Sequence, residues 1–285
     1  MVESTECPAS IKSDVSRALA EDVGTGDISA ALIDRDLTAN AEVVTRDAGV
    51  FCGRPYVDEV CTQIDPAIQV HWQVGDGDEL TPDQVLFGLQ GPARSLLTAE
   101  RTLLNFVQLL SGTASQTRHY VRLIEHTDAV LLDTRKTLPG LRAAQKYAVR
   151  CGGGSNHRMG LYDAYLIKEN HVAAAGSIAA AVRRARALHA DHTIEVEVED
   201  LDELTQAIEA GVDIALLDNF NLADTAKAVA RAQGRVKLEA SGGIDENSIV
   251  EIADAGVDYV SVGQLTKNVA PLDLSMRFVD SPSTG

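Results

Sequence analysis

Between residues 129 and 267 the chain repeats one pattern, in which a short apolar segment ends at a polar residue and a helical segment usually follows. The apolar segments are AVLLD (129–133), DAYLIK (163–168), TIEVEV (193–198), DIALLD (213–218), RVKLEA (235–240) and DYVSVG (258–263). Units of roughly 20 to 35 residues predict alternating strands and helices with a parallel sheet. Six strand signals, with a seventh too weak to detect, favour a closed α/β barrel of about seven parallel strands over an open sheet. No GxGxxG or GxxxxGKS/T motif follows the first strand, so a nucleotide-binding open sheet lacks its best marker.

Residues 1–112 follow a different pattern and predict a smaller α+β domain. Alternation within AEVVT and IQVHWQV, broken by Gly and Asp turns, indicates an antiparallel sheet with one face against helices. A long helical pattern from Ser95 to about His126 connects the halves, with Gly112 as a point of interruption. We therefore expect an N-terminal domain with its connecting helix (1–112), a barrel (113–270) and a tail (271–285) that packs back toward the N-terminal domain.

Composition excludes several classes of function. The chain has 25 Lys and Arg against 42 Asp and Glu, a net charge of −17, which argues against nucleic acids and anionic membranes as partners. No apolar run approaches the roughly 18 residues that cross a membrane. The first ten residues do not resemble a secretion signal, and the four cysteines contain no CxxC pair. We expect reduced thiols and a cytoplasmic location.

The predicted strands end in residues that suit an active site. In a parallel α/β barrel the carboxyl ends of the strands meet on one face, where active sites form. These ends carry charged side chains or residues compatible with phosphate binding: Asp133, Arg135, Lys136, Lys168, Glu197, Asp218, Ser241 and Gly263. So many such residues at one predicted face indicate a built site.

The segment TIEVEVED places three carboxylates on one face of a strand. Glu195, Glu197 and Glu199 alternate with apolar residues, so they need partners or a metal if both faces of the strand are covered. The alternative is an edge strand with a solvated acidic face. Because Asp218 ends the next strand beside Glu197, the pair could hold Mg²⁺ through water or stabilise a cation that forms in the substrate.

Residues 133–171 form a basic island, with seven Lys and Arg against three Asp and Glu. A focused positive pocket in an acidic protein suits a substrate with several negative charges. Arginine forks bind carboxylates at two points, while Lys136 and Lys168 act as point charges. The spacing of Arg142, Lys146 and Arg150 also fits one solvated helix face, and we expect this for two of the three.

Two glycine-containing segments after the last strands are candidate phosphate sites. LEASGGI places Ser241, Gly242 and Gly243 after one strand, and VSVGQLT places Gly263 and Gln264 after the next. Glycine lets backbone N–H groups approach an anion, and the loops after the last two barrel strands commonly bind phosphate.

The chain resembles one known family over about residues 15–275. The segments AERTLLNFVQLLSG, DTRKTLPGLRAAQKYAVRCGGGSNHRMGLYDAYLIKENH, EVEV, LLDNF, LEASGGI and GVDYVSVGQLT, together with EDVGTGD, are similar to nicotinate-nucleotide pyrophosphorylase, also called quinolinate phosphoribosyltransferase. The resemblance implies that quinolinate reacts with 5-phosphoribosyl 1-diphosphate to give nicotinate mononucleotide, diphosphate and CO₂, with Mg²⁺, in de novo NAD biosynthesis. It also implies a homodimer, or a higher oligomer, whose active sites take residues from two subunits.

Roles for individual residues follow from this resemblance. Arg101, donated across the dimer interface, would join Arg135, His157 and Arg158 in holding the two quinolinate carboxylates. Lys136 and Lys168 would bind the diphosphate or the reacting centre, and Thr134 would be a further substrate contact. The resemblance assigns Glu197 and Asp218 to the ribose hydroxyls and Mg²⁺. The 5-phosphate would be held by Ser241, Gly242, Gly243, Val262, Gly263 and Gln264.

Three other interpretations remain open at this point. The nearest is a sibling phosphoribosyltransferase that acts on nicotinate or another small planar acid. A Schiff-base aldolase would use Lys168 as its amine. A barrel that only binds phosphorylated metabolites would show ligand-induced stabilisation without turnover.

Overall fold

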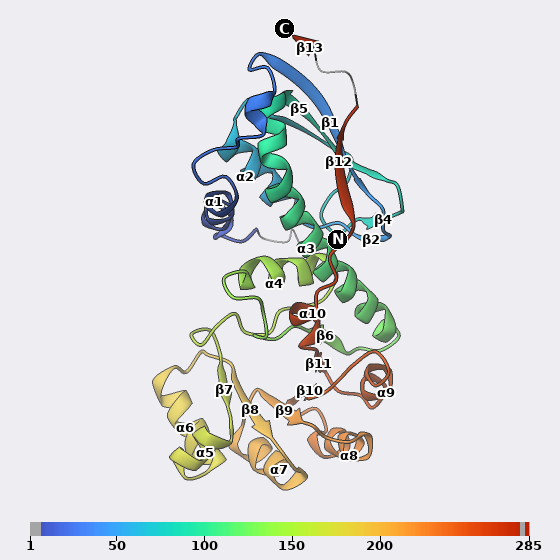
Figure 1. Ribbon diagram of the computed structural model, residues 1–285. Coiled ribbons are helices and arrows are strands. Elements are labelled where there is room, and N and C mark those ends of the chain that lie inside the picture. The colour runs from blue at the N-terminus through green and yellow to red at the C-terminus, as the bar shows by residue number, and fades with distance from the viewer. Residues whose placement is uncertain (1–6, 280–282, 285) are drawn as a thin grey trace. The chain divides into compact units, whose positions relative to one another are not determined.

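The computed structural model describes residues 7–279 and 283–284, which form two compact units (Figure 1). The first unit combines the chain up to Arg118, the stretch Leu138–Gly153, and the chain from Asn268 onward. The second unit contains His119–Thr137 and Gly154–Lys267. Neither unit is therefore a single continuous stretch of sequence.

The first unit is built on an antiparallel sheet. Its strands are β1 (Leu37–Thr45), β2 (Gly49–Val50), β3 (Gln69–Trp72), β4 (Glu79–Leu80), β5 (Val85–Pro92), β12 (Leu274–Phe278) and β13 (Ser283–Thr284). The main sheet has the order β12-β1-β5-β3, with β13 also paired to β1, and β2 pairs with β4. The C-terminal strand β12 pairs antiparallel with β1, so the end of the chain completes the sheet that its beginning starts.

Helices cover this sheet and form the apolar core of the first unit with it. They are α1 (Ile11–Asp22), the 3₁₀ helix η1 (Ala30–Leu32), α2 (Arg54–Ile64), α3 (Ala93–Ile124) and α4 (Arg142–Cys151). Val15, Phe51, Phe87, Leu103 and Ala148 are fully buried in one apolar cluster. Removal of such side chains from water is the main favourable contribution to folding of this unit.

The expected interruption at Gly112 is wrong. Helix α3 is 32 residues long and continues through this position. A Cβ at this position would lie 2.3 Å from the carbonyl oxygen of Ala270. The glycine therefore serves close packing against the C-terminal segment.

The second unit contains a parallel six-stranded sheet. Its strands are β6 (Val130–Leu132), β7 (Tyr165–Ile167), β8 (Ile194–Val198), β9 (Ile214–Asp218), β10 (Lys237–Ser241) and β11 (Tyr259–Ser261). Their order is β6-β11-β10-β9-β8-β7, and every pairing is parallel. A parallel bridge joins Leu132 to Ser155 beside β6. The sheet therefore has six strands, against the expected count of about seven.

Helices alternate with these strands. They are α5 (Glu169–Ala175), α6 (Ile178–Leu188), α7 (Leu201–Ala210), α8 (Leu222–Ala232), α9 (Ile249–Asp254) and α10 (Gln264–Lys267). Three of them begin at a side chain that accepts a backbone N–H of the first turn: Ser177, Asp200 and Asn221. The predicted α/β barrel-like sheet flanked by helices is confirmed, and so is the smaller N-terminal domain with its antiparallel sheet.

The division of the chain differs from the expected boundaries in one long stretch and in two short ones, residues 113–118 and 268–270. Residues 138–153, placed by sequence within the barrel, belong to the first unit, because α4 buries Ala144, Tyr147 and Ala148 in its apolar core. Lys146 on the same helix is also fully buried. Lys146 is therefore not part of a solvated helix face with Arg142 and Arg150.

Two composition-based expectations have structural counterparts. In the part of the chain that the structure describes, no helix combines the length and apolar character needed to span a membrane. All four cysteines are free thiols, and Cys52, Cys61 and Cys151 are buried.

Candidate active site

A cavity of about 330 Å³ lies at the carboxyl ends of the strands of the second unit. Every residue that lines it belongs to this unit. The lining residues are Thr134, Arg135, Lys136, His157, Arg158, Leu166, Lys168, Glu197, Leu216, Asp218, Glu239, Ser241, Gly242 and Ser261. The cavity therefore collects polar groups from all six strands or from the segments that follow them, as expected for a parallel barrel.

One side of this cavity is cationic. Arg135 has a buried Nη1 atom with no hydrogen-bond partner among the described residues. The pKa of Arg158 is lowered, first by burial and then by the positive charge of Arg135, and its Nη1 donates to the carbonyl of Ala164 at 3.3 Å. An unpaired guanidinium nitrogen next to a second arginine is a place where an anion would be stabilised.

Carboxylates occupy another part of the cavity lining. Lys168 Nζ forms an ion pair with Glu197 Oε2. Asp218, at the end of β9, lies in register with Ser241 at the end of β10. Cations and carboxylates therefore meet in one cavity, an arrangement suited to a substrate that carries negative charge and becomes locally positive during reaction.

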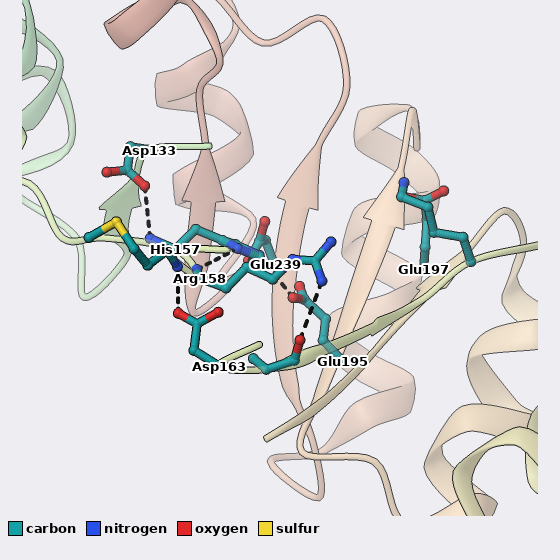
Figure 2. Close-up of polar contacts among 10 residues, drawn as sticks. Asp133, His157, Arg158, Asp163, Glu195, Glu197 and Glu239 are labelled. Carbon is teal, nitrogen blue, oxygen red and sulfur yellow. Dashed lines mark hydrogen bonds and ion pairs between the residues drawn. The ribbon is translucent and has the colours of Figure 1, made fainter. Parts of the chain in front are cut away.

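The row of acids on β8 runs from the interior of the protein to solvent. Glu195 is buried, Glu197 is half-buried and Glu199 is exposed. The alternative of a fully solvated acidic face is therefore wrong for Glu195. The Nε2 atom of His157 lies 2.8 Å from Oε2 of this carboxylate (Figure 2).

The segment that carries His157 is held by hydrogen bonds at its base. Buried Asp133 accepts the backbone N–H of His157 at 2.9 Å (Figure 2). Its other oxygen accepts an N–H of Asn156 Nδ2 at 2.6 Å. The ring Nδ1 of His157 accepts the backbone N–H of Arg158 at 2.8 Å. Because Nδ1 is an acceptor, the ring proton lies on Nε2, toward Glu195.

Two glycines in this region make room for neighbouring groups. A Cβ on Gly263 would lie 2.9 Å from Lys136 Cδ, so the glycine leaves space for that lysine. Gly242 has φ of +99°, and a Cβ there would lie 2.9 Å from the backbone nitrogen of Asn219. Both positions fit a backbone that closely approaches its surroundings.

Ten of the residues singled out by sequence line this cavity: Thr134, Arg135, Lys136, His157, Arg158, Lys168, Glu197, Asp218, Ser241 and Gly242. Gly243, Val262, Gly263 and Gln264 belong to the same unit but are not among the lining residues. Arg101 is exposed on the first unit. The structure therefore brings together the expected cations and carboxylates of the second unit.

Sequence reasoning missed Glu239 and Ser261, which also line the cavity. Glu239 is 1% exposed and lies inside β10 rather than at its end. Burial, and then the negative charge of Glu195, raise the pKa of Glu239 to about 8. The available signal was the single acid between the apolar residues Leu238 and Ala240.

A cavity of about 390 Å³ in the first unit has a different chemistry. It is lined by Asp14, Glu21 and Asp22 with a single arginine, Arg17, which is paired with Asp14. This lining lacks the unpaired cations of the second-unit cavity and does not suit a polyanion.

The sequence matches two domain families in order along the chain. Residues 27–111 match the quinolinate phosphoribosyl transferase N-terminal domain, and residues 113–277 match its C-terminal domain. This chain belongs to the quinolinate phosphoribosyl transferase family. The family assignment agrees with the two types of sheet and with the cavity on the parallel one.

Individual members of the family are similar over nearly their whole length. "Probable nicotinate-nucleotide pyrophosphorylase (carboxylating)" of Bacillus subtilis is 44% identical over 259 residues, which cover 90% of this chain and 89% of the relative. The Mycobacterium leprae nicotinate-nucleotide pyrophosphorylase is 43% identical, covering 92% and 95%. The structure of the Francisella tularensis nicotinate-nucleotide pyrophosphorylase is 50% identical with a TM-score of 0.92, covering 96% of this chain and 98% of that one.

Proposed function

We propose that this chain is a carboxylating nicotinate-nucleotide pyrophosphorylase. It transfers a phosphoribosyl group from 5-phosphoribosyl 1-diphosphate to quinolinate and removes one carboxylate, which yields nicotinate mononucleotide, diphosphate and CO₂ in de novo NAD biosynthesis. The observation that carries this proposal is the cavity in which Arg135, Arg158 and Lys168 face Glu197 and Asp218. Family membership and the names of the relatives support it.

The cationic side of the cavity would hold the quinolinate dianion. Arg135 Nη1 is buried with no hydrogen-bond partner among the described residues, so a carboxylate would satisfy it. Arg158 supplies the second guanidinium. His157 also lines the cavity, but Nδ1 and Nε2 of its ring are engaged with Arg158 and Glu195. The two arginines therefore carry the carboxylate contacts in this proposal, and His157 supports them.

The sugar donor would occupy the rest of the cavity. Lys136 and Lys168 would neutralise the diphosphate. The ribose hydroxyls would meet Glu197 and Asp218, and Thr134 would be a further contact. The backbone around Ser241, Gly242, Gly243, Val262, Gly263 and Gln264 would hold the 5-phosphate, since glycine allows N–H groups to approach an anion.

Glu197 and Asp218 fit a magnesium ion by their chemistry. Both offer carboxylate oxygens, the ligands that Mg²⁺ prefers, and Mg²⁺ usually keeps several waters and binds substrate phosphates together with one or two carboxylates. When bound, the ion would neutralise charge on the departing diphosphate. In this structure Lys168 already pairs with one oxygen of Glu197, so the lysine and the cation would share this carboxylate.

The protein's own groups promote the reaction by position and charge. As diphosphate leaves the sugar carbon, an oxocarbenium-like centre forms, and carboxylates such as Glu197 and Asp218 stabilise it. The pyridine nitrogen is a weak nucleophile, so alignment by Arg135 and Arg158 supplies much of the rate enhancement. Once alkylated, the ring withdraws electrons from the adjacent carboxylate and favours its loss.

We also propose a cytoplasmic homodimer, or a higher oligomer, in which Arg101 of one subunit contacts quinolinate at the other subunit's site. The exposure of Arg101 on the first unit supports this role, since an exposed guanidinium is available to a second chain. Size-exclusion chromatography with light scattering measures the oligomer. Mixing an inactive Arg101→Ala chain with an inactive Lys168→Ala chain then tests sharing, because only shared sites would regain activity.

The central experiment incubates purified protein with quinolinate, the phosphoribosyl donor and Mg²⁺, and measures nicotinate mononucleotide, diphosphate and CO₂. Equal amounts of the three products are expected, and absence of all three over a range of salt concentrations would refute the proposal. Replacing quinolinate by nicotinate tests the sibling activity, which we expect to be far slower because only one carboxylate remains for the two arginines. The Nζ atom of Lys168 is engaged in an ion pair with Glu197, whereas a Schiff-base enzyme needs a free amine at this position.

A further inference from the structure

Two buried acids, of which Glu239 lines the cavity, have no role in the function proposed for this site. Glu195 on β8 and Glu239 on β10 project from two strands that both flank β9, and the Nε2 atom of His157 lies between them (Figure 2). Nε2 is 2.8 Å from Glu195 Oε2 and 3.5 Å from Glu239 Oε2. The side chains of Glu195 and Glu239 are only 4% and 1% exposed.

The donors around this cluster are too few for two ionised carboxylates. His157 contributes one N–H, and its shorter contact is with Glu195. Within the part of the chain that the structure describes, both oxygens of Glu239 and Oε1 of Glu195 lack a hydrogen-bond donor. An ionised carboxylate that is buried without donors is strongly disfavoured, and two adjacent ones still more, so one of the pair holds a proton.

Glu239 is the member of the pair that holds this proton. Its pKa is raised to about 8, first by burial and then by the negative charge of Glu195. The titratable groups that face it are Glu195 on β8 and His157 from the segment before β7, while Ser261 faces it from β11. The other charged groups of the same cavity are Arg135, Lys136, Arg158, Lys168, Glu197 and Asp218. At neutral pH Glu239 is thus an acid that lines the cavity.

The proposed reaction consumes one proton at a ring carbon. When the C–C bond to the leaving carboxylate breaks, CO₂ departs and the electron pair stays on the ring carbon. That carbon must then form a C–H bond. We propose that Glu239 is the general acid that supplies this proton.

The step balances without any further reactant. The O–H bond of Glu239 breaks as the C–H bond forms, which leaves Glu239 as a carboxylate beside the N–H of His157. Water that enters after product release restores the proton. Ser261, whose buried Oγ also lacks a hydrogen-bond partner among the described residues, stands in the same cavity lining as Glu239. Because this inference rests on the proposed function, its test must separate the transfer step from the loss of CO₂.

The test is a rapid-quench comparison of wild type with Glu239→Gln, which keeps the shape of the side chain but removes the acidic proton. Diphosphate reports phosphoribosyl transfer, and CO₂ from labelled quinolinate reports decarboxylation. We expect Glu239→Gln to form diphosphate within about threefold of wild type, whereas CO₂ release falls by about 10²-fold or more, the usual range for loss of a general acid. The carboxylated mononucleotide then accumulates. Glu239→Asp should recover part of the CO₂ release, and Glu251→Gln, an exposed residue of α9, should match wild type.

Each other outcome has a definite meaning. If CO₂ and diphosphate fall together, Glu239 has a structural or binding role, and if neither falls, it donates no proton; both results overturn the inference but leave the proposed function intact. No diphosphate from wild type would instead refute the proposed function. A stoichiometric metal ion that wild type retains and Glu239→Gln loses would make His157, Glu195 and Glu239 ligands, and would also overturn the inference.

A second measurement needs no variant and covers the case in which Glu239→Gln fails to fold. In wild type the single-turnover rate of CO₂ release should decline as pH rises through about 8, while diphosphate formation in the same samples does not. Parallel decline of both rates, or constant CO₂ release to pH 10, would overturn the inference.

Discussion

Buried and half-buried acids occur in both units, but their hydrogen-bonding surroundings differ. In the first unit, Asp14 is paired with Ser10 Oγ through one oxygen and with Arg17 through the other. Asp76 accepts the backbone N–H groups of Gly53 and Arg54 on one oxygen, at 2.8 and 3.1 Å, and the hydroxyl of Tyr147 on the other. These acids have donors for both oxygens, and Asp76 connects segments that are distant in sequence.

The second unit contains both kinds of acid. Asp133, away from the cavity lining, accepts hydrogen bonds on both oxygens. Glu239, in the cavity lining, has none on either. The contrast indicates that a buried acid with donors on both oxygens stabilises the fold, whereas one that lacks donors is kept for a ligand or a proton. The predictions that follow test this distinction.

The largest expected effect concerns Arg135, a cation without a partner for its buried Nη1 atom. Arg135→Ala should lower kcat/KM for quinolinate by about 10²- to 10³-fold, the cost of losing two charge-assisted hydrogen bonds. Stability should change little, because no hydrogen bond of Nη1 to the described part of the protein is lost. Steady-state kinetics and thermal unfolding measure the two effects, with exposed Arg183→Ala as the control. If Arg135→Ala were strongly destabilised but kept a normal kcat/KM, Arg135 would stabilise the fold and would not bind substrate.

Asp76 tests the other side of the comparison. Asp76→Ala removes the acceptor for two backbone N–H groups at the start of α2 and for Tyr147, so the free energy of unfolding should fall by about 2 to 3 kcal/mol. Chemical denaturation measures this loss. The activity of the folded fraction should stay within about twofold of wild type. Asp202→Ala, whose side chain is 95% exposed, is the matched control and should change neither quantity.

The sequence predicted those site residues whose positions follow from a general property of parallel sheets. Parallel strands end on one face, so Lys168, Glu197 and Asp218 were expected together once the strands were recognised. Glu239 lies within its strand, and a lone inward acid gives no pattern to detect. Its significance depends on Glu195 and His157, which come from distant segments.

The assignment of α4 shows a second limit. Periodicity predicts a helix near residues 142–151 but does not say which of two apolar surfaces it will cover. Because α4 packs in the core of the first unit, Lys146 is buried. Its spacing from Arg142 and Arg150 is nevertheless typical of a solvated helix face. Such placement depends on tertiary contacts that the sequence pattern does not contain.

Two glycines in the turn after β10 have different surroundings. Gly242 and Gly243 both have positive φ, but a Cβ on Gly242 would collide with Asn219, whereas one on Gly243 would meet nothing within 4 Å. Gly243→Ala should cost about 1 kcal/mol of stability from backbone strain alone, and Gly242→Ala about 2. In addition, Gly242→Ala should raise the KM for the phosphoribosyl donor several-fold. Equal effects on stability and KM would show that steric contact at Gly242 is unimportant.

The last expected effect is a pH dependence of stability that comes from Glu239. In the unfolded chain this carboxyl ionises near its ordinary pKa of 4.5, whereas in the folded protein it keeps its proton until about pH 8. The folded state therefore binds more protons between these values, and the contribution of Glu239 to stability falls as pH rises toward 8 and then levels off. Thermal unfolding of wild type and Glu239→Gln from pH 5 to 9 measures this term, because glutamine does not titrate. We expect the difference in stability to shift in favour of Glu239→Gln as pH rises, and a difference that is constant with pH would mean that Glu239 is ionised in the folded protein.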